Sequence, residues 1–65
     1  MTRKDYILIA AALQAAKAKI RTAENVEAVD TLIDGVDYAV GYIADALKAN
    51  NGAFDAERFL AAVGP

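Results

Sequence analysis

The side chains best suited to chemistry in this sequence are carboxylates, because the chain contains neither histidine nor cysteine. Their absence removes the commonest general base, the commonest activator of a nucleophile and most transition-metal sites. Four aspartates share one side of an expected helix: Asp30, Asp34, Asp37 and Asp45. Stacked carboxylates can bind calcium or magnesium, but a straight helix spaces them along a ridge and does not wrap them around an ion. We therefore interpret them as a solvated polar face, and we expect no metal, no cofactor and no enzymatic activity.

A second set of charges is basic and is a candidate for contact with nucleic acid. It comprises Arg3, Lys4, Lys17, Lys19 and Arg21. Several helical turns separate the first two of these residues from the other three, so they form two small clusters and no continuous stripe. The segment that follows is acidic, and the net charge of the chain is −2. We interpret the basic residues as an ordinary solvated face and keep nucleic-acid binding as an alternative only.

Four apolar or aromatic side chains are candidates for a contact surface. Tyr38 and Tyr42 lie one helical turn apart; they either form an interaction surface, where tyrosine is enriched, or cover the edge of the core with their hydroxyls in water. At least one of Ile7 and Leu8 must point away from a two-helix core. It packs either under a third helix or into a dimer interface, and the sequence favours neither.

Apolar periodicity predicts the helices that position these residues. Spacings of three and four, without proline, connect Val26, Val29, Ile33, Val36, Val40, Ile43 and Leu47. This pattern is typical of a long helix that packs lengthwise on other helices. It predicts a helix over about 26–49 that ends at Asn50-Asn51-Gly52.

A second periodic pattern precedes this one. It consists of Tyr6, Ile9, Leu13, Ala16, Ile20 and Ala23, and it predicts a helix over about 3–21. Thr2 and Asp5 have the spacing of a capping box at its start. Asn25 is the expected N-cap of the following helix. We expect a hairpin in preference to a single helix over 3–49, because a turn near 22–25 places the basic end of one helix beside the acidic start of the next.

Two features refine this fold. Gly35 and Gly41 lie inside the second helix at a cost of about 1 kcal/mol each relative to alanine, which suggests close approach of a neighbour or relief of crowding. Asp55 is an N-cap flanked by a hydrophobic staple of Phe54 and Phe59, which predicts a short helix over about 56–63. The sequence therefore predicts a single small domain over 1–65, all-α, in which an antiparallel hairpin is closed by a short C-terminal helix.

Because the chain is small, we consider self-association. A chain of 65 residues buries only about 60 % of its unfolded surface, and disulfides and zinc are both excluded as additional support. A homodimeric bundle and a monomer are left as equal alternatives. The apolar run from Tyr6 to Leu13 is too short to cross a bilayer, so we expect no membrane association and a cytoplasmic location.

Both ends of the chain resemble small uncharacterised proteins of bacteriophages and prophages. The resemblance is carried by Met1-Thr2-Arg3-Lys4-Asp5-Tyr6 and by Ile43-Ala44-Asp45-Ala46-Leu47 leading through Asn51 to Phe54-Asp55-x-x-Arg58-Phe59-Leu60-x-Ala62-x-Gly64. It implies a small helical protein made in a bacterial host and implies no activity. Arg58 is the polar residue of this tail without a capping role; we expect it to pair with an acid of the second helix or with that helix's C-terminal end, or else to contact a partner.

These observations favour a non-enzymatic accessory protein that acts through protein–protein interaction. Its expected partner is a host or phage protein, for example a host factor or a defence system, or a second copy of itself. The alternatives are a small nucleic-acid-binding transcriptional accessory protein and a self-assembling structural component of the phage.

Overall fold

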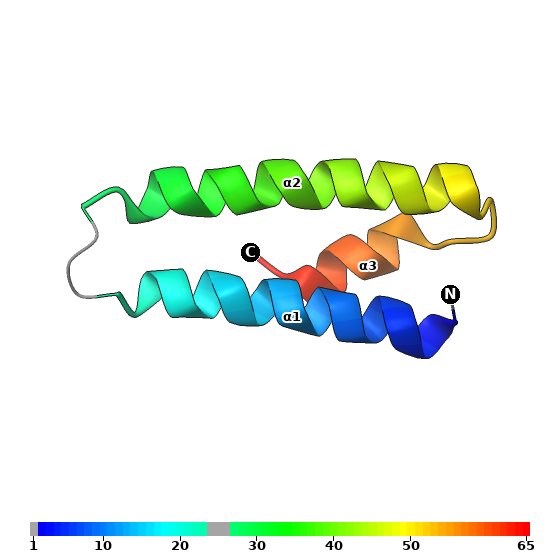
Figure 1. Ribbon diagram of the computed structural model, residues 1–65, viewed down its shortest axis with the longest axis horizontal. Helices are drawn as coiled ribbons and strands as arrows, with labels where there is room; N and C mark the ends of the chain where they lie inside the picture. Colours follow the sequence, from blue (N-terminus) through cyan, green and yellow to red (C-terminus); the bar gives the residue numbers. More distant parts are fainter. Residues whose placement is uncertain (1, 24–26) are drawn as a thin grey trace.

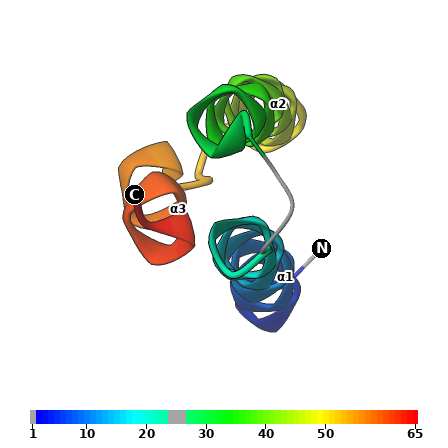
Figure 2. The same ribbon diagram turned by 90° about the vertical axis from the view of Figure 1, so that its left-hand side faces the viewer.

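The computed structural model describes residues 2–23 and 27–65 and places them in three helices (Figure 1). They are α1 (Arg3–Arg21), α2 (Val29–Asn50) and α3 (Ala56–Val63). α1 and α2 lie antiparallel along the 40 Å axis of the molecule, and α3 packs against one side of both (Figure 2). The predicted all-α hairpin with a short closing helix is confirmed, and the single helix over 3–49 is excluded.

The start of α1 follows from a capping box formed by Thr2 and Asp5. The backbone N–H of Thr2 donates to the Asp5 carboxylate at 2.8 Å. This bond satisfies a donor that would otherwise lack a partner at the helix end, and it is the main reason that the pKa of Asp5 lies below its ordinary value. The predicted bounds of this helix, 3–21, are confirmed.

α2 begins later than the periodicity predicts. Residues 27 and 28 form a turn, and Ala28 has a non-helical backbone (φ −117°, ψ 46°), so the first helical residue is Val29. The expected N-cap, Asn25, and the expected first residue, Val26, lie outside the described residues. The predicted end is confirmed: α2 stops at Asn50 because Asn51 is extended.

The local signals of α3 are all confirmed. The Asp55 carboxylate accepts a hydrogen bond from the backbone N–H of Arg58 at 3.0 Å, which caps the helix. The rings of Phe54 and Phe59 are 5.5 Å apart between centroids, as a hydrophobic staple requires. The helix spans the predicted residues 56–63.

The core lies where the three helices meet. Its buried members are Ala10, Val40, Ala44, Phe54, Phe59 and Val63. The described residues of the apolar pattern predicted for α2 are all buried or half-buried, which confirms that pattern.

The apolar pattern predicted for α1 is wrong at two positions. Ala16 and Ala23 are exposed, whereas Ala10 and Lys17 are buried. The reason is α3, because a helix packed on one side of the hairpin turns the buried face of α1 towards that side.

The two glycines inside α2 have no packing role within the described chain. A methyl group added at Gly35 or Gly41 would meet nothing within 4 Å, so the expected close approach of a neighbour is wrong.

Gly41→Ala is therefore expected to raise the free energy of unfolding by about 1 kcal/mol, because glycine is that much the weaker helix former. Thermal and urea unfolding followed by circular dichroism measure the change. Gly64→Ala is the matched control: Gly64 has φ +79°, a conformation that alanine adopts only with strain, so this variant should be less stable than wild type.

Candidate functional site

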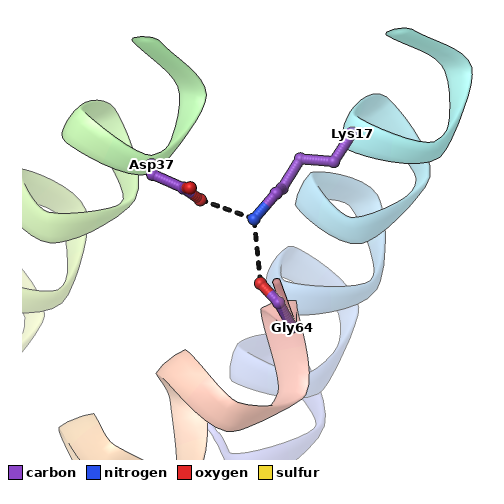
Figure 3. A network of polar contacts seen from close by, with 3 residues as sticks. All are labelled: Lys17, Asp37 and Gly64. Carbon is purple, nitrogen blue, oxygen red and sulfur yellow. Dashed lines mark hydrogen bonds and ion pairs between the residues drawn. The ribbon is translucent and has the colours of Figure 1, made fainter. Parts of the chain in front are cut away.

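A buried lysine joins all three helices. Lys17 on α1 is only 1 % exposed. Its Nζ donates to the Asp37 carboxylate on α2 at 2.5 Å and to the backbone carbonyl of Gly64, at the end of α3, at 2.8 Å (Figure 3). The Asp37 side chain is 48 % exposed, so the ion pair has one buried end and one that reaches water.

The chemistry of this network is structural. α3 has no basic residue in its own last turn, and Lys17 supplies the positive charge that stabilises the C-terminal end of a helix. An amine that is covered and held by two acceptors is not available to react with a carbonyl substrate. The interpretation of Lys17 as a member of a solvated face is therefore wrong, whereas Asp37 is exposed to water as expected.

A cleft of about 660 Å³ lies between α1 and α3. Its residues are Arg3, Tyr6, Ile7, Ala10, Asn51, Ala53, Phe54, Asp55, Arg58, Phe59 and Ala62. Most of this lining is apolar.

The aromatic wall of the cleft is interlocked. The Tyr6 and Phe54 rings pack edge to face at 4.6 Å between centroids, and Phe54 in turn packs on Phe59. The Tyr6 hydroxyl accepts a hydrogen bond from the Asn51 amide at 3.3 Å. These contacts hold the wall in place without a ligand, as a preformed site requires.

Two arginines line the same cleft, Arg3 from α1 and Arg58 from α3. Neither forms a salt bridge with any other residue that the structure describes. The expected pairing of Arg58 with an acid of α2 or with the end of that helix is therefore wrong, because α3 turns this side chain towards α1. The two guanidinium groups give the cleft positive charge beside Asp55, whose carboxylate already caps α3.

Tyr38 and Tyr42 form a second, separate feature on the outer side of α2. They are 69 % and 64 % exposed, with ring centroids 5.1 Å apart and hydroxyl oxygens 3.3 Å apart. The hydrogen bond between the two hydroxyl groups is the main reason that the pKa of Tyr42 is raised. This exposure excludes the interpretation that the rings cover the edge of the core.

The five candidate contact residues thus do not form one site. Ile7 and Arg58 meet at the α1–α3 cleft, Tyr38 and Tyr42 pair on α2, and Leu8 belongs to neither group. Ile7 and Leu8 are both largely exposed, at 60 % and 69 %. The third helix therefore covers neither side chain completely.

The structure gives little support for a metal site among the aspartates of α2. Asp30, Asp34 and Asp45 are exposed, and within the described ranges no three acidic side chains gather closely enough to hold a metal ion. Over the same ranges, no helix combines the length and the apolar character needed to cross a membrane.

Comparison of the chain with protein-family models, with curated proteins and with solved structures finds no match in any of the three.

Proposed function

We propose that this chain is a non-enzymatic accessory protein of a bacteriophage or prophage that binds another protein in the cytoplasm of the bacterial host. The docking site is the α1–α3 cleft. Its partner is an acidic, partly apolar segment of a host or phage protein.

The observation that carries this proposal is the pairing of an interlocked aromatic wall with two arginines at one cleft. Aromatic and arginine side chains are the residues that contribute most to binding at protein interfaces. An apolar side chain of the partner would pack on Tyr6 and Ile7, and its carboxylates would meet the guanidinium groups of Arg3 and Arg58. Arginine binds carboxylates through two parallel hydrogen bonds, which adds geometric selectivity.

The nucleic-acid alternative has weaker support. Lys17 is buried in an ion pair and cannot contact a phosphate. The remaining basic residues of α1 lie near its two ends, Arg3 and Lys4 at one and Lys19 and Arg21 at the other. Such a distribution does not form the continuous stripe that tracks a phosphate backbone.

The test is retention of proteins from a bacterial lysate on three immobilised proteins: wild type, Arg58→Glu and Arg21→Glu. Both variants reverse one exposed arginine on a helix, but only Arg58 lines the cleft. We expect a protein that wild type and Arg21→Glu retain equally and that Arg58→Glu loses by about tenfold or more, which corresponds to one charge-assisted contact.

Equal loss in both variants would contradict the proposed site, and absence of any retained protein would contradict the proposed function. Duplex DNA applied to the same three proteins at low salt tests the alternative, because phosphate binding weakens steeply as salt rises.

A further inference from the structure

Tyr38 and Tyr42 form an exposed aromatic pair on α2 that the proposed docking site does not use. They are 69 % and 64 % exposed, and neither of them lines the α1–α3 cleft. Residues four apart are neighbours on the surface of a helix, so the two phenol groups lie side by side. Both are therefore accessible to reactive solutes.

The composition of the chain makes tyrosine the main target of one-electron oxidation. Cysteine and tryptophan, the other side chains that readily lose a single electron, are both absent. The single methionine, Met1, reacts differently, by taking up an oxygen atom to form a sulfoxide. Of the three tyrosines, Tyr6 is half-buried and packs on Phe54. A one-electron oxidant therefore meets Tyr38 and Tyr42 first.

The two exposed rings converge at their hydroxyl ends. Their hydroxyl oxygens are 3.3 Å apart, whereas their centroids are 5.1 Å apart. The ortho carbons, which adjoin the carbon that bears the hydroxyl group, therefore lie near the closest approach of the rings. The ring planes are inclined by 53°, and two phenols joined through ortho carbons are also twisted, because their hydroxyl groups crowd each other. Little movement separates this pair from a directly bonded one, and exposed side chains change rotamer within about nanoseconds.

We propose that Tyr38 and Tyr42 are an oxidative modification site, at which an oxidant of the haem-peroxidase class, supplied with hydrogen peroxide, joins the two rings within one chain. Each phenol loses one electron to the oxidant and one proton to water, which leaves a phenoxyl radical. The two radicals form a carbon–carbon bond between their ortho carbons. The hydrogen on each of these carbons then moves to the oxygen of its own ring, which restores both phenols as dityrosine.

The reaction balances with one molecule of hydrogen peroxide. Two electrons and two protons leave the tyrosine pair in total, and they convert the peroxide to two molecules of water. The product has the mass of one chain less two hydrogen atoms. Because the pair lies apart from the α1–α3 cleft, this modification does not depend on the proposed function.

The hydrogen bond between the two hydroxyl groups favours coupling within a chain. It holds the phenols together before either is oxidised, so a second radical forms beside the first. Coupling of two groups that are already side by side is effectively unimolecular and does not depend on protein concentration. Coupling between two chains, in contrast, slows on dilution.

Neighbouring charges act in the same direction. Asp34 precedes Tyr38 by four residues and Asp45 follows Tyr42 by three, spacings that bring side chains to one side of a helix. Both aspartates are exposed. The same side of a second chain carries the same negative charges, which repel it. The charges therefore oppose cross-linking between chains and leave coupling within a chain unaffected.

Oxidation by a haem peroxidase with one equivalent of hydrogen peroxide tests the proposal on wild type, Tyr6→Phe and Tyr38→Phe. Wild type and Tyr6→Phe should give dityrosine fluorescence in a product with the mass of a single chain. Its yield per chain should stay constant on dilution from about 100 μM to about 1 μM, because the coupling is unimolecular. Tyr38→Phe should lose this product by about tenfold or more. Peptide mapping should assign the cross-link to Tyr38 and Tyr42.

A matched control moves one tyrosine without changing their number. Tyr42→Phe together with Ala49→Tyr keeps two exposed rings on α2, since Ala49 is exposed. It separates them by eleven residues, which is about 16 Å along a helix. This variant should give cross-links only between chains, and fewer of them on dilution.

Three results would overturn the proposal. The first is a wild type that is oxidised without forming dityrosine, and the second is wild-type dityrosine found only in linked pairs of chains. The third is a rearranged variant that couples within one chain as readily as wild type, because position on the helix would then not matter. Circular dichroism before oxidation should show that all the variants are as helical as wild type, since the exchanged side chains at residues 38, 42 and 49 are exposed.

Discussion

Asp37→Ala is expected to lower the free energy of unfolding by about 3 kcal/mol or more, whereas Lys17→Met is expected to change it by less than about 1 kcal/mol. The asymmetry arises because the two ends of this ion pair differ in exposure, 1 % for Lys17 and 48 % for Asp37. Removing Asp37 leaves a buried ammonium group with only the carbonyl of Gly64 as partner, and an uncompensated buried charge is costly. Removing the lysine leaves a carboxylate that water already reaches.

Urea unfolding of the two variants at one protein concentration measures this difference. Methionine fills nearly the same volume as the lysine stem, so Lys17→Met separates the loss of charge from the formation of a cavity. Lys17→Ala adds the cavity and should fall between the two. A larger loss for Lys17→Met than for Asp37→Ala would show that the ion pair itself, and not the desolvation of its buried end, stabilises the fold.

Local signals in the sequence predicted the helix bounds well. The start of α1 and both ends of α3 depend on groups within a few residues of each other, such as the Asp55 carboxylate and the N–H of Arg58. Such caps act without regard to the rest of the chain. The start of α2 lacks one, because Ala28 offers no side-chain acceptor, and the prediction was wrong there.

The direction in which each helix faces was harder to predict, because it depends on the third helix. The buried face of α1 was expected to contain Ile9 and Ala16, but its fully buried residues are Ala10 and Lys17. The pattern of buried residues was missed because one of its members, Lys17, is charged and was assigned to the solvent-exposed face. The signal that could have corrected this is the spacing of four and three that connects Tyr6, Ala10, Leu13, Lys17 and Ile20.

The candidate site was predicted in part. Ile7 and Arg58 were both selected as contact residues, but only the packing of α3 on α1 shows that they line one cleft. Arg3 was considered only as a basic residue and Phe54 only as part of a staple. Their shared position depends on contacts between segments about 50 residues apart, which no local pattern contains.

Phe59→Ala is expected to lower the free energy of unfolding by about 3–5 kcal/mol, the usual cost of removing a buried aromatic ring. Phe59 is 4 % exposed and packs on Phe54, so its loss leaves a cavity at the junction of the three helices. A domain of this length has a total stability of about 3–10 kcal/mol. The variant should therefore be largely unfolded near room temperature, as loss of helical circular dichroism would show.

Leu60→Ala is the matched control, because Leu60 is the next residue on the same helix and is 44 % exposed. It removes a large apolar side chain at similar helix propensity and should cost about 1 kcal/mol or less, since surface substitutions change little. Similar losses for both variants would mean that α3 is held mainly by its own helical propensity. A loss confined to Phe59→Ala would instead show that one ring fastens α3 to the hairpin and so maintains the α1–α3 cleft.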